Sequence, residues 1–150
     1  MYENQIVKIY LKDNHLLQAL CSDGLFREIN INDLIDSYAM YEPLKDKNLF
    51  NKAKLKANFI IEWNYDIDLF GDYIFENGKI IKNIESPTIP LIGFKIKQAR
   101  LAKEMSQKKL AKLSGIEQSE ISRLEKGLIN PSIEYLEKIT NVLGLKIEII

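Results

Sequence analysis

One window of 20 residues, 107–126, constrains the fold of this chain more than any other part of it. Two short helices that cross near a right angle through a tight turn need a small residue where they touch and a residue that accepts positive φ in the turn. They also need an apolar residue directly after the turn, then a β-branched and an apolar residue three positions apart on the second helix. The window meets these demands, in order, with Ala111, Gly115, Ile116, Ile121 and Leu124. We therefore predict two helices joined by a tight turn.

The flanking sequence extends this pattern into a resemblance. The matching residues are Arg100, Ser106-Gln107, Leu110-Ala111, Gly115-Ile116, Ile121 to Gly127, Asn130-Pro131-Ser132 and Leu143-Gly144. With them, residues 92–145 resemble the Xre/Cro-type helix-turn-helix family, the fold of lambdoid phage repressors and many bacterial regulators and antitoxins. The resemblance implies an all-α, lambda-repressor-like domain that binds double-stranded DNA.

The remainder of the chain predicts a second, different domain. Residues 6–29 read as a three-stranded meander with a hairpin at Asp23-Gly24, because that dipeptide tolerates the positive φ of a two-residue turn. We expect helices over 32–38, capped by Asn32, and over 44–52, starting at Pro43. A strand is expected at 59–63, and 73–81 predicts either a hairpin or a helix that ends at Gly78.

Two prolines and a change of charge divide the chain. Residues 1–90 carry 10 Lys/Arg against 14 Asp/Glu, a net of −4, and residues 91–150 carry 11 against 7, a net of +4. We predict an α+β domain at 1–84, a linker at 85–90 and a helix-turn-helix domain at 91–150. The fold class is therefore α+β: a small antiparallel-sheet domain, followed by four short helices. Through Ser22-Asp23-Gly24, Tyr41-Glu42-Pro43-Leu44 with Phe50 after it, and Ile61-Glu62-Trp63, the first 80 residues resemble a small bacterial α+β domain of uncharacterised function.

The predicted DNA contacts follow from helix geometry and from the family together. Ser106 caps the first helix of the pair, so that its amides face a phosphate, and Gln107 reinforces that contact. Lys108 and Lys109 add charge, although Lys109 stands where the family often has Glu, which removes the capping box. The second helix, 118–126, is expected to lie in the major groove. Its predicted contact residues are Gln118, which can pair bidentately with adenine, then Ser119, Ser122, Arg123 and Lys126, with Asn130 in the following turn.

Glu117 and Glu120 are unfavourable for DNA binding, because their negative charges lie at the end of the helix that is expected to approach a polyanion. One interpretation is that one of them accepts a hydrogen bond from cytosine; the favoured one is that both complement the helix dipole. Other residues are expected to have structural roles. In the family Arg100 and Glu125 form a partly buried salt bridge, and Ala111, Gly115, Ile121 and Leu124 shape the helix pair.

The first domain shows no pattern that favours catalysis. Asp66, Asp68 and Asp72 are too loosely spaced for a calcium loop, and solvated loop carboxylates are the favoured interpretation. His15 is expected to be surface or half-buried, and Cys21 to be a buried apolar residue. We expect no enzyme activity, no metal and no cofactor. A single cysteine and the lack of a secretion or membrane-spanning segment favour a reducing cytoplasm.

The leading function is a sequence-specific transcriptional regulator that acts as a homodimer, with a protein partner or small ligand at the first domain. The alternatives are an antitoxin that autoregulates its operon, or a protein-interaction module that has lost DNA binding. The alternating tail 145–150 is expected to form a strand, which either joins the first domain's sheet or pairs with a second copy.

Overall fold

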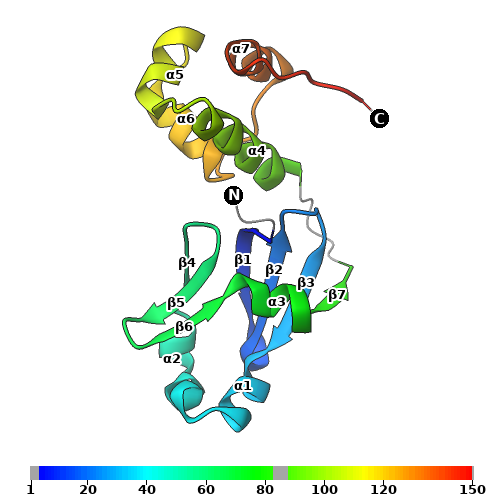
Figure 1. The fold of residues 1–150 in the computed structure, drawn as a ribbon, viewed down its shortest axis with the longest axis vertical. Coiled ribbons are helices and arrows are strands. Elements are labelled where there is room, and N and C mark those ends of the chain that lie inside the picture. Colours follow the sequence, from blue (N-terminus) through cyan, green and yellow to red (C-terminus); the bar gives the residue numbers. More distant parts are fainter. Residues whose placement is uncertain (1–3, 83–87, 150) are drawn as a thin grey trace. The chain divides into compact units, whose positions relative to one another are not determined.

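The computed structural model describes residues 4–82 and 88–149. It divides into two compact units, Met1–Glu85 and Ser86–Ile150. Within the described ranges, none of the helices has the length and apolar character that a membrane span requires. The α+β class is confirmed, because the first unit is built on antiparallel sheets and the second on helices alone (Figure 1).

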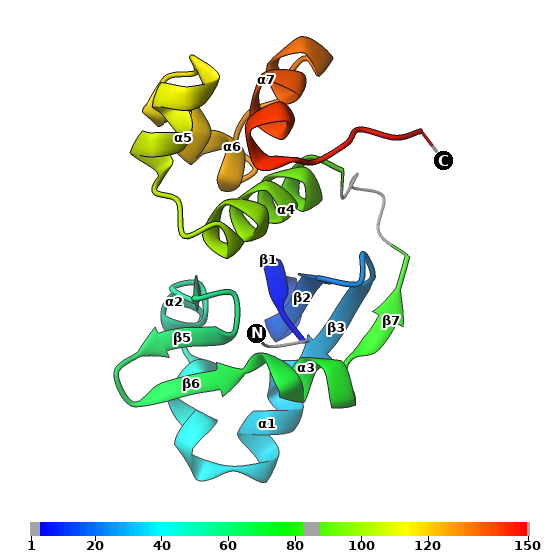
Figure 2. The same cartoon turned by 45° about the horizontal axis from the view of Figure 1, so that its top comes forward.

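Two antiparallel sheets form the frame of the first unit. The larger has the order β1-β2-β3-β7 (Figure 2), and the smaller the order β4-β5-β6 (Figure 1). Their strands are β1 (Ile6–Lys12), β2 (Leu16–Cys21), β3 (Phe26–Asn30), β7 (Lys79–Ile81), β4 (Lys54–Lys56), β5 (Ile60–Asn64) and β6 (Ile67–Phe70). The predicted meander and the predicted strand at 59–63 are confirmed, the latter one residue later at its start.

Short helical segments connect these strands: η1 (Asp13–His15), α1 (Ile31–Ser37), η2 (Ala39–Lys45), α2 (Lys47–Phe50) and α3 (Gly71–Asn77). The cap of α1 is Asn30, whose side chain accepts from the amide of Asn32, so the predicted cap at Asn32 is wrong. The expected helix 44–52 is also wrong in extent, since Pro43 lies inside the 3-10 segment and the chain restarts at Asp46, the cap of α2.

Two turns of the first unit bear on the predictions from the sequence. The first differs from the predicted turn, and the second decides between two alternatives. In the hairpin after β2 only Gly24 takes positive φ, at 83°, while its amide donates to the Cys21 carbonyl at 2.9 Å. This is a wider turn than the predicted two-residue one. At 73–81 the helix is correct and the hairpin is not. Gly78 follows α3 with ordinary φ, and its requirement is space, because a Cβ there would lie 2.4 Å from the Ile74 carbonyl oxygen.

The core of the first unit gathers both sheets and the helical segments around Leu17, Leu44, Phe50, Ile61 and Ile74, each at most 1% exposed. Trp63 belongs to the same core, and its Nε1 donates a hydrogen bond to the Phe50 carbonyl at 3.1 Å. Burial of these apolar side chains stabilises the first unit.

The second unit consists of α4 (Thr88–Ala102), α5 (Gln107–Ser114), α6 (Gln118–Glu125) and α7 (Ile133–Leu143). These are the four helices that the apolar period predicts. The core between them is made by Ile96, Leu110, Ile116, Ile121, Leu124, Leu136, Ile139 and Leu143. Helix α4 begins at Thr88, so residues 88–90 of the expected linker are helical, and Pro90 fits because the first helical turn needs no amide partner. Linker residues 85–87 lie outside the described residues.

The tail after α7 is not the predicted strand. Gly144 takes φ 68° and the Leu145 amide donates back to the Thr140 carbonyl at 2.9 Å, which ends the helix. Residues 145–149 then continue as a chain with no strand partner in the described part of the protein (Figure 1). Alternation of apolar and polar residues shows only that a segment can form a strand. A strand also needs a neighbour that supplies hydrogen bonds.

Candidate nucleic-acid interface

The turn between α5 and α6 has the geometry that the sequence window requires. Gly115 caps α5 with φ 74°, and its amide donates to the Ala111 carbonyl at 3.0 Å. Ile116 directly follows and is 8% exposed, and Ile121 and Leu124 are fully buried on the inner face of α6. Helix α6 is thereby held by its apolar side, and its opposite side faces solvent.

Helix α4 supports α6 through a contact that sequence reasoning missed. Gly93 is buried in α4, and a Cβ built on it would lie 2.1 Å from the carbonyl oxygen of Leu124. The two helix backbones therefore approach each other at the one position where a side chain is absent. An isolated glycine within a predicted helix was the available signal, since glycine in that place costs helix stability unless close packing requires it.

A buried polar cluster joins three helices beside this contact. Arg100 donates from Nε to Glu125 Oε1 at 2.7 Å and from Nη2 to Oε2 at 3.0 Å, and its Nη1 donates to the Met105 carbonyl at 2.6 Å. The side chains of Arg100 and Glu125 are 8% and 3% exposed. This is the salt bridge that the resemblance implies. Gln107 adds a third contact to the cluster, donating to Glu125 Oε2 at 2.9 Å.

The beginning of α5 presents capped amides and three lysines. Ser106 Oγ accepts from the amide of Lys109 at 3.0 Å, which is the predicted N-cap contact. Lys108, Lys109 and Lys112 are exposed on this helix. Gln107 is only half-exposed, because its side chain turns toward Glu125. The positive end of the helix dipole and the lysine charges lie on the same short element.

The outer face of α6 carries the predicted contact residues of the second helix. Gln118, Ser119, Arg123 and Lys126 are exposed, and Ser122 is half-exposed. Helix α6 ends at Glu125, with Lys126 as its C-cap. Gln118 occupies the first helical position, beside the turn that Gly115 makes. These side chains share one solvent-facing surface, while the buried pair on the other side fixes its orientation.

The two acidic residues at the start of α6 are in different positions. Glu117 is the N-cap, and its side chain makes no capping hydrogen bond. Glu120 is in the first turn, on the side of α7: burial, followed by the negative charge of Glu120, raises the pKa of Tyr135 to about 12. The hydroxyl of Tyr135 is buried and has no hydrogen-bond partner among the described residues. Glu120 is exposed in the first turn of α6, a position where a carboxylate complements the helix dipole.

The turn after α6 prepares the start of α7. Gly127 takes φ 70°, and the amide of Leu128 donates back to the Arg123 carbonyl at 2.9 Å. Asn130 is exposed in this turn, and Ser132 caps α7 by accepting from the Tyr135 amide at 3.1 Å. Asn130 therefore lies between two helix termini, on an exposed segment.

Sequence comparison places these helices in a known family. A family model described as helix-turn-helix matches residues 96–150. Control protein C.BamHI of Bacillus amyloliquefaciens is 42% identical over 57 residues, which make up 37% of this chain and 70% of that protein. The chain belongs to the helix-turn-helix family. The matched segment is of the Xre/Cro type that the residue pattern predicts.

Other relatives of this helix-turn-helix protein share the same segment. The HTH-type transcriptional regulator SinR of Bacillus subtilis (strain 168) is 41% identical over 58 residues, 38% of this chain and 52% of SinR. This chain thus spans about half the length of that relative. A solved structure described as the master regulator for biofilm formation SinR in complex with DNA is 43% identical, covers 37% of this chain and 89% of that one, and has a TM-score of 0.36.

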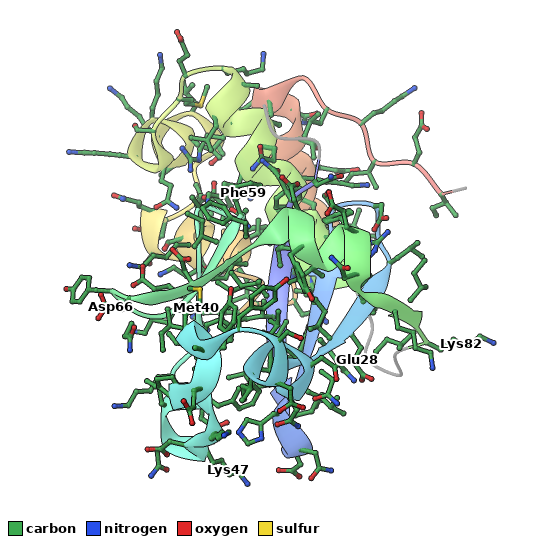
Figure 3. The ribbon with its side chains drawn as sticks, turned by 60° about the horizontal axis from the view of Figure 1, so that its bottom comes forward. Glu28, Met40, Lys47, Phe59, Asp66 and Lys82 are labelled. Carbon is green, nitrogen blue, oxygen red and sulfur yellow. The ribbon has the colours of Figure 1, made fainter. Side chains whose placement is uncertain are left out.

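The first unit of this helix-turn-helix protein does not bring its candidate residues together. In the described ranges, no group of three or more His, Cys, Asp or Glu side chains is arranged to hold a metal ion. Asp66 lies at the tip of the β5–β6 turn (Figure 3), whereas Asp72 is in α3, where Asn4 donates to it at 3.4 Å. Cys21 is fully buried, as expected, and burial raises the pKa of its thiol. His15 is half-buried, and its ring centroid lies 4.9 Å from that of Phe50, with the two ring planes tilted by 45°.

Proposed function

We propose that this protein is a sequence-specific DNA-binding transcriptional regulator whose helix α6 lies in the major groove. The observation that carries the proposal is the two-sided character of α6. Ile121 and Leu124 are fully buried, while Gln118, Ser119 and Arg123 are exposed on the opposite side. A helix held in this way offers hydrogen-bonding side chains at a fixed orientation, which base-edge recognition requires.

The N-terminal end of α5 is assigned to the phosphate backbone. The capped amides at Ser106 and the exposed Lys108 and Lys109 supply donors and positive charge without sequence preference. Gln107 lies beside them, and Lys126 and Asn130 provide further polar groups at the far end of α6. These contacts position the protein on the duplex, and α6 then discriminates between sequences.

Gln118 is assigned the main base contact, with Ser119, Ser122 and Arg123 as secondary ones. A glutamine amide pairs bidentately with adenine, and an arginine with guanine or a phosphate. Glu117 and Glu120 lower affinity for any polyanion, so the net attraction rests on the lysines. We assign both acids to the helix dipole.

We further propose that the protein acts as a homodimer and is not an enzyme. Operators of this kind of domain are read as two half-sites about one helical turn apart. The first unit is assigned to regulation, through a protein partner or a small ligand. Because the role requires double-stranded DNA, we place the protein in the cytoplasm. The proposed role in transcriptional regulation is supported by the names of two relatives, one a transcriptional regulator and the other a control protein.

Selection of duplexes from a random pool tests the proposal directly. The full chain is expected to enrich one motif, and the logarithm of the binding constant is expected to fall linearly with the logarithm of salt concentration. Enrichment of no sequence, together with binding that is independent of salt, would contradict DNA binding and favour a protein-interaction module.

Substitution of Gln118 separates base contact from backbone contact. Gln118→Ala is expected to cost about 1–3 kcal/mol of binding free energy on the selected site and to relax preference at one base pair. Lys108→Ala is the matched comparison, since it is expected to weaken all duplexes alike and to reduce the salt slope by about 1. Both are measured by fluorescence anisotropy on the selected duplex and its single-base variants. A base-selective loss with Lys108→Ala would overturn the assignment of that residue.

A further inference from the structure

A polar pocket opens in the first unit where strands β1 and β2 are joined. It has a volume of about 500 Å³ and is lined by Lys12, Asp13, Asn14, His15, Lys47 and Phe50. Lys47 of α2 lies at this end of the unit (Figure 3), with its Nζ 3.5 Å from Asp13 Oδ1. Sites for small organic molecules have volumes of about 300–1,000 Å³, so this pocket has room for such a ligand.

The backbone of the β1–β2 connection is strained. Asn14 and His15 take φ of 61° and 60°, in the left-handed region that residues other than glycine rarely adopt. Asn32 holds the turn, since its Nδ2 donates to the Asn14 carbonyl at 3.2 Å. The result is that His15 lies against the core, with its ring centroid 4.9 Å from that of Phe50. Backbone strain of this kind is found most often where it positions a functional side chain.

His15 has a hydrogen-bonding requirement that its own chain does not meet. Its Nε2 atom is buried and has no hydrogen-bond partner among the described residues. Nearly all buried polar atoms in folded proteins have a partner, so an unpaired one requires an explanation. Because His15 also lines the pocket, a molecule bound there can supply the partner.

Hydrogen-bond donors dominate the wall of the pocket. The ammonium groups of Lys12 and Lys47 can only donate, and the Asn14 amide and the His15 imidazole can donate as well. Asp13 is the carboxylate among the lining residues, and it is exposed and already lies beside Lys47. A ligand that complements this wall must therefore bring acceptors and negative charge, as an oxyanion does.

From this arrangement we infer that the pocket binds a small organic anion, whose carboxylate or phosphate group lies between Lys12, Lys47 and His15. The remainder of the ligand lies against the His15 ring, which Phe50 supports from the core. The inference deepens the regulatory role proposed for the first unit, and rests on it only in treating the bound anion as an effector. Binding to the pocket itself requires no DNA.

The single histidine of the chain gives a direct measurement, because its ring protons have no counterpart from another histidine in the proton NMR spectrum. The full chain is titrated without DNA against phenyl phosphate, benzoate and inorganic phosphate, with benzylamine as the cationic comparison. The His15 resonances are expected to shift saturably with the anions and not with benzylamine. The tighter of the two aromatic anions identifies the preferred charged group. Resonances that no anion shifts would overturn the inference.

Charge variants test whether the pocket is the site. Lys47→Met is expected to weaken anion binding about fivefold and Asp13→Asn to tighten it about fivefold, the effect of one unit charge about 4 Å away in water. Lys45→Met is the matched control and is expected to leave binding unchanged. Lys45 pairs with Glu42 at 3.4 Å and is 63% exposed, comparable to 69% for Lys47. Equal losses from the two lysine variants, or a loss with Asp13→Asn, would contradict an anion site here.

His15→Phe tests the role of the imidazole, because it keeps a ring against Phe50 and removes both ring nitrogens. It is expected to weaken phenyl phosphate binding at least about tenfold in isothermal titration calorimetry, as for a lost hydrogen bond to a charged group. Circular dichroism checks that the variant is folded. Wild-type affinity in a folded His15→Phe protein would refute the contact between His15 and the anion.

The effector role has its own measurement. Saturating phenyl phosphate is expected to change the Kd of the full chain for its selected duplex at least about fivefold, the lower range of allosteric coupling. An unchanged Kd would refute the effector role. The NMR titration is made without DNA, so its outcome is independent of whether α6 recognises a duplex.

Discussion

Replacement of Gly93 with alanine is expected to destabilise the second unit by about 3 kcal/mol, the upper range for an overpacked core. The added Cβ would lie 2.1 Å from the Leu124 carbonyl oxygen, which is backbone and has no rotamer to escape into. Helix propensity alone predicts the opposite sign, a gain of about 0.5–1 kcal/mol. Urea unfolding followed by circular dichroism at 222 nm measures the change.

The chain offers two controls for this variant. Gly144→Ala meets no atom within 4 Å and suffers only from φ 68°, so a loss of about 1–2 kcal/mol is expected. Trp63, the chain's single tryptophan, lies in the first unit, so the unfolding midpoint of its fluorescence should not move. A Gly93→Ala protein as stable as the wild type would disprove the close contact of α4 with α6.

The second large effect is expected at the buried ion pair. Arg100→Met leaves the Glu125 carboxylate, 3% exposed, with Gln107 as its only remaining partner among the described side chains. Removal of one partner from a buried pair costs about 3–5 kcal/mol, because the other charge stays desolvated. Chemical unfolding of the full chain tests this, with the fluorescence of Trp63 again as the internal reference.

The double variant R100M/E125M distinguishes a stranded charge from lost packing. Since replacement of both charges by apolar groups is often close to neutral, it should recover most of the stability. An exposed ion pair on α7 gives the comparison. Lys138 Nζ lies 3.9 Å from Glu134 Oε1, and the two side chains are 53% and 83% exposed. Lys138→Met is expected to lower the free energy of unfolding by less than about 0.5 kcal/mol. Equal losses at the buried and the exposed pair would argue against this account.

The helix pair was predictable because its demands are local. Gly115, Ile121 and Leu124 are specified by spacing within one turn and two short helices, and the structure has each of them in the required position. Gly93 was not predictable in this way. A glycine is required at position 93 because the carbonyl oxygen of Leu124, more than 30 positions away in the sequence, lies where a Cβ would be. The spacing of apolar residues in a sequence does not predict how closely two helix backbones approach.

The errors have the same origin. Asn30 and Asn32 are equally good N-caps by residue type, and the choice between them depends on the residue at which β3 ends. The tail alternates like a strand, yet the described residues supply no neighbouring strand with which it could pair. The contact residues of α6 stay a prediction, since sequence and fold fix their exposure, whereas the base pairs they meet belong to the DNA.

The bond from Gln107 to Glu125 has a consequence for the thermodynamics of recognition. A mobile glutamine at an interface loses about 0.5–1.5 kcal/mol of rotamer entropy when it is immobilised. Here that entropy is lost when the protein folds, because the amide is already held at 2.9 Å by a buried carboxylate. The surface that we propose as the phosphate contact is therefore preorganised, and the entropy of DNA binding measured by calorimetry should contain little of the unfavourable contribution that comes from ordering side chains on contact.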